Sequence, residues 1–211
     1  MAAEVGAVPA ERVRLVRRNT LLLSAAEPSL RAVLSLTFTV GSIAVFRFSG
    51  RESYAGYLTA ATFAAAAVAA VVAGRAMDRL GRRPGLAAGH GTLVVAAGVA
   101  AVAVSARSAP VLLIAAALFG AGQGAANLGR GAMADMYEPE RRGRAVGILL
   151  AVGTIGAVGG PILAAGTQAF ARNVLGVEPL LFPWAVVAAL ALLGLTAVLN
   201  LRPDPRDLAV A

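Results

Sequence analysis

Long runs of apolar residues alternate with short, arginine-rich stretches along the chain. Six runs are long enough to cross a bilayer, because a helix rises about 1.5 Å per residue and the hydrocarbon core is about 30 Å thick. Ala and Gly dominate these runs and no strand-like alternation is present, so the pattern predicts an all-α bundle of six transmembrane helices. The predicted spans are Leu21–Phe46, Tyr54–Ala73, Pro84–Ala106, Pro110–Gly129, Ala145–Gln168 and Leu180–Leu201.

The composition excludes a soluble domain. Of 211 residues, 58% are hydrophobic and only 14% are charged, whereas about a quarter of the residues of a typical soluble domain are charged. The chain has no cysteine and a single histidine, so we expect no disulfide, metal site or cofactor. An enzyme is not expected either, because the lone His90 has no Gly-x-Ser-x-Gly partner that an intramembrane serine protease would need.

The distribution of arginine predicts the orientation. Fourteen of the nineteen arginines lie in the N-terminal tail, the second and fourth connections and the C-terminal tail, namely Arg12, Arg14, Arg17, Arg18, Arg75, Arg79, Arg82, Arg83, Arg130, Arg141, Arg142, Arg144, Arg202 and Arg206. Basic connections stay in the cytoplasm, so both termini are expected there, in a bacterial inner (plasma) membrane. The formal charge of +8 is then a topology signal, which predicts contact with membrane lipid and excludes nucleic acid as a partner. Residues 1–20 are expected to form a basic cytoplasmic tail, residues 21–201 the bundle, and residues 202–211 a cytoplasmic tail or a truncated central linker.

The second connection, "GRAMDRLGRRPG" at residues 74–85, has a tighter order than a basic loop requires. Gly81 permits the left-handed backbone of a sharp reversal, and Pro84 suits the first turn of the next helix. Asp78 is placed to pair with a neighbouring arginine or to lie against a helix N-terminus, whose partial positive charge attracts it.

These residues resemble the signature loop of the major facilitator superfamily of secondary transporters. The matching positions are Gly74, Asp78, Arg79, Gly81, Arg82 and Arg83. The resemblance implies one six-helix half of that fold and a cytoplasmic latch formed by this loop together with Asp135. A basic loop that only sets topology is the alternative interpretation of these arginines, and the two are compatible.

The fifth span also resembles a motif of this family. Gly147, Gly156 and Gly160-Pro161 follow its antiporter pattern, although Ala164-Ala165 replace the usual terminal glycine pair. Residues 156, 160 and 164 recur every four positions, which predicts a smooth ridge for another helix, and Pro161 predicts a kink. Ordinary helix packing is the alternative to an antiporter role.

Ionisable and polar residues inside a span are functional candidates, because they are costly in lipid. Glu27 and Arg31 are four residues apart and share a helix face. We expect them either to line a cavity for substrate or a proton, or to form a structural pair near the cytoplasmic end, or Glu27 to cap a span that begins at Pro28. Gln123 and Asn127 form a second polar stripe that faces either the cavity or another helix.

Three further residues of the spans carry expectations. Arg130 is expected to pair with Asp135 or to extend toward the interface, and His90 to serve as a packing donor rather than a proton carrier. Gln123-Gly124 matches the fourth-helix motif of the family, but Gly120 stands where that motif usually has an arginine.

The resemblance covers about residues 15 to 205 and implies the N-terminal half of a twelve-helix transporter. The leading hypothesis is a half-length transporter or subunit that exports a small organic solute in exchange for protons by alternating access. It would pair with a separately encoded second half or with a second copy of itself, unless it is a truncated product. The alternative is a non-transporting membrane remnant or a regulatory partner of a full-length transporter.

Overall fold

The computed structural model describes residues 10–209, so positions 1–9 and 210–211 of the expected tails lie outside the described residues. Within the described part the chain is helical and contains no strand. Its elements are α1 (Ala10–Ser49), α2 (Ser53–Leu80), α3 (Arg82–Ser105), α4 (Ala109–Ala126), α5 (Gly129–Asp135), α6 (Pro139–Phe170), the π-helical turn η1 (Ala171–Leu175), α7 (Phe182–Leu199) and the 3-10 turn η2 (Pro205–Leu208).

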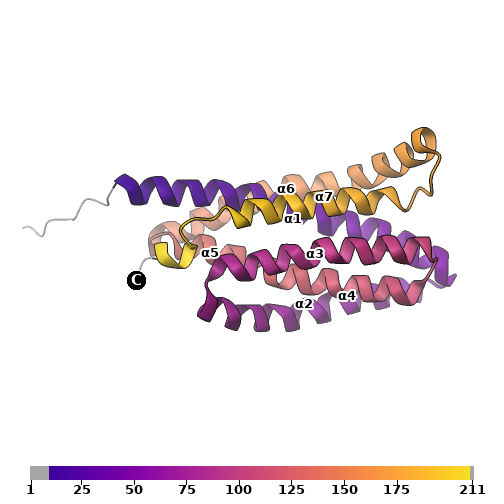
Figure 1. Ribbon diagram of the computed structural model, residues 1–211, viewed down its shortest axis with the longest axis horizontal. Helices are drawn as coiled ribbons and strands as arrows, with labels where there is room; N and C mark the ends of the chain where they lie inside the picture. The colour runs from indigo at the N-terminus through magenta and orange to yellow at the C-terminus, as the bar shows by residue number, and fades with distance from the viewer. Residues whose placement is uncertain (1–9, 210–211) are drawn as a thin grey trace, which may run out of the picture.

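Six helical stretches among the described residues are long and apolar enough to cross a membrane. Helices α4 and α5 together make one of them, and α6 with η1 makes another. The predicted all-α bundle of six transmembrane helices is therefore confirmed. The helices lie side by side along one axis (Figure 1), as short connections between antiparallel neighbours require.

The helix boundaries differ from the predicted apolar spans at several places, one of which is the end of α2 at Leu80 rather than at Ala73. Helix α1 begins at Ala10 and α6 at Pro139, ahead of the predicted starts at Leu21 and Ala145, because backbone hydrogen bonds continue past the point where the apolar run stops. The predicted fourth span is interrupted by a turn between α4 and α5, next to Asn127. The helices therefore extend beyond the hydrocarbon-length segments that hydropathy marks.

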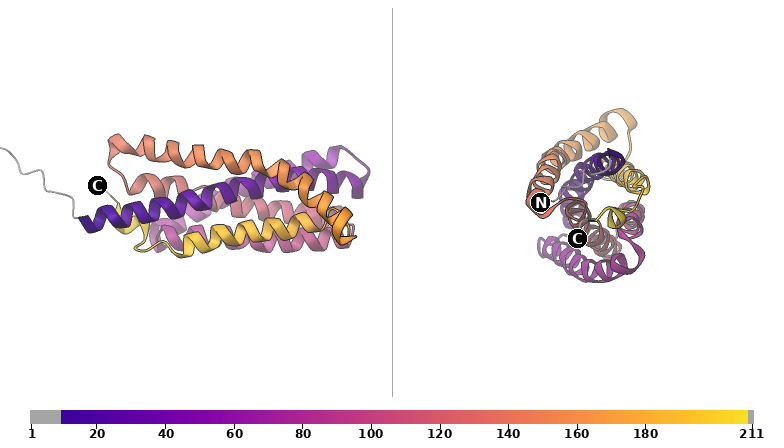
Figure 2. Two further views of the ribbon diagram at one scale, coloured as in Figure 1. Left: turned by 90° about the horizontal axis from the view of Figure 1, so that it is seen from above. Right: turned by 90° about the vertical axis from the view of Figure 1, so that its left-hand side faces the viewer.

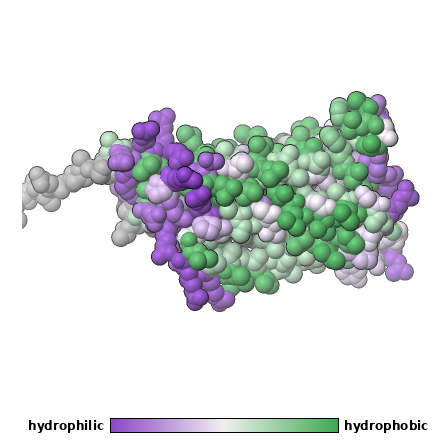
Figure 3. All heavy atoms as spheres, in the orientation of Figure 1, coloured by the Kyte–Doolittle hydropathy of each residue, from purple (hydrophilic) through white to green (hydrophobic). Residues whose placement is uncertain are grey.

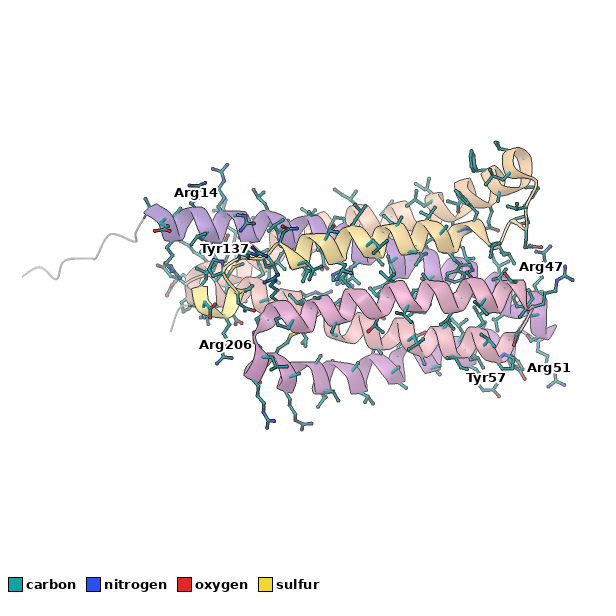
Figure 4. All side chains as sticks on the ribbon, in the orientation of Figure 1. Arg14, Arg47, Arg51, Tyr57, Tyr137 and Arg206 are labelled. Carbon is teal, nitrogen blue, oxygen red and sulfur yellow. The ribbon has the colours of Figure 1, made fainter. Side chains whose placement is uncertain are left out.

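Charge gathers at the two ends of the bundle. The start of α1, the α2–α3 connection, the start of α6 and the C-terminal segment meet at one end, which we call the basic end (Figure 1). Arg47 and Arg51 lie at the opposite end (Figure 4). Between them the surface is mainly apolar (Figure 3), as expected of a protein that lipid surrounds.

Helices α2 and α6 expose apolar side chains most extensively. Large apolar side chains more than half exposed include Phe63, Val68, Val71 and Val72 of α2 and Ile148, Ile155, Val158 and Ile162 of α6. Helix α1 packs against α6 and α7, α4 packs against α2 and α3, and contact between α3 and α7 joins the two groups. The outer faces of α2 and α6 are therefore free to meet lipid or another helix bundle.

Glycines bring α6 against α1. A Cβ at Gly156 would overlap the carbonyl group of Pro28, and one at Gly160 would overlap the side chain of Ser35. Ala164, the next position of the series, is fully buried. The predicted ridge of small residues thus packs on another helix, and that helix is α1.

Pro161 gives this contact a polar link. Proline has no N–H, so the carbonyl of Ala157 loses its helical donor. The Ser35 hydroxyl of α1 donates to that carbonyl at 2.9 Å. Helix α6 changes direction in its C-terminal half (Figure 2), the behaviour expected of a proline-containing helix.

A second glycine contact joins α4 to α2. A Cβ at Gly120 would overlap the carbonyl of Thr62, and one at Gly124 that of Ala66. An arginine side chain at Gly120 therefore has no space in this arrangement, which gives a packing reason for the departure from the family's fourth-helix motif.

Two glycines of α6 allow a matched test of the packing. Gly156→Ala is expected to lower the free energy of unfolding by about 1–3 kcal/mol, because its methyl group must displace α1. Gly159→Ala is the control, because a Cβ there meets nothing within 4 Å. It should be neutral or stabilising by up to about 1 kcal/mol from helix propensity alone.

Thermal unfolding in detergent, followed by the fluorescence of the single tryptophan, measures both variants. Equal changes in the two proteins would contradict the close approach of α6 to α1.

Candidate functional site

A buried ion pair occupies the inner face of α1. The guanidinium of Arg31 donates to Oε1 of Glu27 through Nε at 2.8 Å and through Nη2 at 2.6 Å. The Glu27 side chain is 5% exposed and that of Arg31 is 18% exposed. Both residues lie well inside the continuous helix α1, so the expectation that Glu27 caps a helix beginning at Pro28 is wrong.

The C-cap of α4 and the first turn of α5 contribute two more groups to the pair. Arg31 donates to Oδ1 of Asn127 at 3.0 Å, and Nη2 of Arg130 lies 3.9 Å from Oε1 of Glu27. Glu27, Arg31, Asn127 and Arg130 therefore form one group, which we call the intramembrane charge cluster. Its two arginines and one carboxylate leave one excess positive charge.

Gln123 lies one turn before Asn127 on α4 but makes no contact of this kind. It is buried, and its Oε1 has no hydrogen-bond partner within the described residues. Of the two expectations for Arg130, the pairing with Asp135 is wrong, because Asp135 pairs with Arg82 instead. The Nε of Arg130 is buried without a partner within residues 10–209.

The tight contact between α6 and α1 continues at the charge cluster. A Cβ at Gly153 would lie 2.9 Å from Cγ of Glu27 and 3.3 Å from Cγ of Arg31. The absence of a side chain at this position is what lets the pair fit against α6. Removing one partner of a buried ion pair costs about 3–5 kcal/mol, so either charge depends on the other for its place in the bundle.

His90 lies on α3. It is buried, and its ring fits against Gly194 of α7, where any Cβ would clash with it. Its Nδ1 has no hydrogen-bond partner within the described residues. A space of about 10 Å³ is lined by both His90 and Glu27, close to the smallest volume that holds one water molecule. The ring packs between helices as expected, but the described residues offer its Nδ1 no acceptor.

Arg82 organises the loop between α2 and α3. Its Nη1 donates to Oδ1 of Asp78 and its Nε donates to Oδ2 of Asp135, each at 2.9 Å. Asp135 is the last residue of α5, so one arginine joins the ends of α2 and α5 to the start of α3. The Asp78 side chain is still 69% exposed and remains open to a further partner.

The C-terminal segment completes this loop, which the sequence analysis did not foresee. Asp204 accepts hydrogen bonds from the backbone N–H groups of Arg82 at 3.0 Å and Arg83 at 2.8 Å, and so caps α3. Arg206 donates to the carbonyls of Asp78 at 2.9 Å and Arg79 at 3.3 Å at the end of α2. Residues taken for a tail or linker thus bind both helix ends of the loop.

Gly81 makes this docking possible. Its φ is +99°, a conformation that side chains rarely adopt. A Cβ there would also lie 2.7 Å from Oδ2 of Asp204. The glycine expected for the chain reversal is therefore also the space that the capping carboxylate enters.

The remaining motif positions lie apart from these groups. A Cβ at Gly147 would meet nothing within 4 Å, and one at Gly74 would meet only Leu128 at 4.0 Å.

Within residues 10–209 no group of three or more His, Asp or Glu side chains could hold a metal ion.

The chain matches a known protein family and several of its members in sequence. The sequence profile of the Major Facilitator Superfamily matches residues 21–210. The chain is 31% identical over 204 residues to the uncharacterized MFS-type transporter YdeG of Bacillus subtilis (strain 168), which covers 95% of this chain and 47% of that protein. It is also 31% identical over 206 residues to the uncharacterized MFS-type transporter YddS of the same organism, covering 96% of this chain and 47% of that one.

Solved structures agree with the fold. The inward-open xylose transporter XylE from E. coli superposes with a TM-score of 0.68 at 18% identity, over 92% of this chain and 49% of that one. A D-xylose-proton symporter gives a TM-score of 0.69 at 19% identity, over 92% of this chain and 50% of the other. The chain thus spans about half the length of the relatives it matches, and the expected likeness to one half of the transporter fold is confirmed.

The capping contact of Asp204 is open to direct measurement. Asp204→Ala is expected to lower the free energy of unfolding by about 1–2 kcal/mol, because two N–H groups of α3 lose their charged acceptor. Asp207→Ala removes the same charge from the same segment at an exposed position and should change stability by less than about 0.5 kcal/mol. Thermal unfolding in detergent compares the two, and equal stability of both variants with the wild type would contradict the cap.

Proposed function

Because the chain belongs to the major facilitator superfamily, we propose that it is one six-helix half of a secondary transporter that exchanges a small organic solute for protons. It is a multi-pass membrane protein, and its matches indicate no catalytic family. The substrate path runs beside α1 and α4, where the intramembrane charge cluster lies.

The buried pair of Glu27 and Arg31 is the observation that carries this proposal. An ionisable pair inside a membrane bundle is expensive and marks substrate or proton pathways. Here the carboxylate is closed in, whereas Arg130 is 39% exposed. The cluster therefore has a sheltered proton acceptor beside a cation that a solute can reach.

The chemistry of the cluster couples its two sites. A proton on Glu27 removes the ionic attraction that holds Arg31 and Arg130 to the carboxylate. The same proton removes the attraction for a cationic group of a solute, which can replace the exposed Arg130 beside the ionised carboxylate. Uptake of a proton therefore releases the solute, and loss of the proton lets the solute bind again. Proton and solute thus compete for Glu27, as exchange requires.

Export rather than import is supported by the α6 motif. The resemblance of Gly147, Gly156 and Gly160-Pro161 to the antiporter pattern is combined here with a close α1–α6 contact that passes directly beside Glu27. A shift of α6 along α1 would therefore change the surroundings of the carboxylate.

A second six-helix bundle completes the transporter in this proposal. Its support is the exposed apolar face of α2 and α6 and the exposed carboxylate of Asp78, which is free to contact the second bundle across the basic end. The loop from Gly74 to Arg83 then acts as a latch between the bundles. A second copy of this chain and a separately encoded half are the two candidates, and light scattering of the chain purified alone distinguishes them by mass.

Orientation is tested by labelling. The chain has no cysteine, so single cysteines at Arg75 of the basic end and at Arg51 of the opposite end report independently. In intact cells an impermeant maleimide should label Arg51→Cys and leave Arg75→Cys unlabelled until the cells are opened, because basic connections remain in the cytoplasm. The reverse pattern would place the termini outside and overturn the proposed orientation.

Proton coupling is tested at Glu27. Cells expressing the chain, alone or with its second half, should accumulate less ethidium than cells with an empty vector. Glu27→Gln is expected to abolish this difference, because the amide has similar shape but cannot take up a proton. Asp78→Asn tests the latch in the same assay and should reduce export.

Glu52→Gln supplies the matched control, since Glu52 is an exposed acid of the opposite end, and it should export like the wild type. If Glu27→Gln exports normally, proton coupling at this residue is wrong. If cells that express the wild-type chain accumulate as much ethidium as cells with the empty vector, the proposed export of this cation is wrong. The alternative of a non-transporting membrane protein is then favoured.

A further inference from the structure

A groove at the basic end combines arginines with apolar side chains. It has a volume of about 270 Å³ and lies between the first turns of α1 and the segment that joins α5 to α6. Its lining residues are Arg12, Val13, Val16, Arg17, Thr20, Leu21, Met136, Tyr137, Glu138 and Arg141. Neither the charge cluster nor the α2–α3 loop contributes to it.

Two of its arginines have no protein partner. The side chains of Arg17 and Arg141 are exposed and make no hydrogen bond or ion pair with the described residues. Arg12 is committed to the chain, because its Nη2 donates to the carbonyl of Leu208 at 2.9 Å. Glu138 is the single acid of the lining, so three arginines against one carboxylate leave a net charge of +2 in the groove.

The apolar part of the groove is exposed as well. Val13 is 55% exposed and Leu21 is 62% exposed, although both lie among the arginines of α1. The wall opposite them is fixed by a hydrogen bond of 2.8 Å between the hydroxyls of Thr20 and Tyr137. Arg14 and Tyr137 in Figure 4 mark this part of the basic end.

Its depth matches the headgroup layer of a bilayer. Leu21 is the first residue of the first long apolar run, and four arginines of α1 precede it. In Figure 3 the hydrophilic band gives way to the apolar belt along this end. Cationic side chains just outside the hydrocarbon attract anionic headgroups, and apolar side chains beside them contact the upper part of an acyl chain.

We propose that this groove binds one anionic phospholipid. The phosphate lies between Arg17 and Arg141, and an acyl chain runs along Leu21 into the bilayer. A soluble phosphate would satisfy the arginines but would leave the apolar side chains in water, which is why the groove fits a lipid better. The proposal does not depend on transport.

Native mass spectrometry of the full chain released from detergent measures the binding. Phosphatidylglycerol, with one net negative charge, is titrated against zwitterionic phosphatidylcholine. The wild type should bind phosphatidylglycerol more tightly. The double variant Arg17→Gln/Arg141→Gln should bind phosphatidylglycerol about 30-fold more weakly, because each interfacial arginine attracts an anionic surface by about 1 kcal/mol. Its affinity for phosphatidylcholine should change less than about twofold.

The control is Arg14→Gln/Arg75→Gln, which removes the same charge from two exposed positions of the basic end outside the groove. It should bind phosphatidylglycerol within about twofold of the wild type. Equal losses in both double variants would mean that the whole basic end attracts the lipid, and would overturn a site in the groove. Unchanged binding by Arg17→Gln/Arg141→Gln would do so too.

Two further experiments distinguish lipid phosphate from free phosphate and show that a loss of binding is not caused by misfolding. Inorganic phosphate at the lipid concentration should not displace phosphatidylglycerol from the wild type, and full displacement would make the site one for free phosphate. Leu21→Ser, at an exposed position, should weaken phosphatidylglycerol binding without altering thermal unfolding. Binding equal to the wild type there would remove the acyl chain from the groove.

Discussion

Close approach of helix backbones is the contact on which the rest of this bundle depends. Lipid surrounds the helices with material as apolar as their own side chains, so burial of apolar surface gives little net attraction between them. Van der Waals contact must supply it, and glycines allow the greatest contact. Gly156 brings α6 onto Pro28 of α1, and Gly120 brings α4 onto Thr62 of α2. These two contacts hold α1 and α4 in the positions from which they present their polar side chains.

The intramembrane charge cluster is a consequence of that packing. Gly153 leaves space beside Glu27 and Arg31, and the turn after α4 brings Asn127 and Arg130 toward the same pair. A buried carboxylate without cations would be too costly to keep ionised. The less exposed Arg31 reduces that cost beside the carboxylate. The more exposed Arg130 leaves positive charge on the open side of the cluster. This asymmetry is the basis of the proposed coupling of one proton to one solute.

The basic end depends on a different kind of contact. There, water competes for every charge, so a single surface ion pair contributes about 0–1 kcal/mol. The loop between α2 and α3 instead gathers several charged hydrogen bonds on Arg82 and Asp204. The C-terminal segment is thereby attached to the loop that resembles the latch, and any movement of that loop must carry the segment or break the cap of α3.

Much of the fold could be predicted from the sequence alone, because hydropathy and charge along the chain are local quantities. The six apolar runs require helices in lipid, since no other backbone conformation satisfies its own hydrogen bonds there, and Gly81 with Pro84 required a sharp turn. Which helices touch was decided only by the tertiary structure. The spacing of Glu27 and Arg31 was visible in the sequence, but the approach of Arg130 to Glu27 rather than to Asp135 was not. Nor was the role of Asp204, because capping joins residues more than a hundred positions apart, and the chain carries no local signal for a partner so distant.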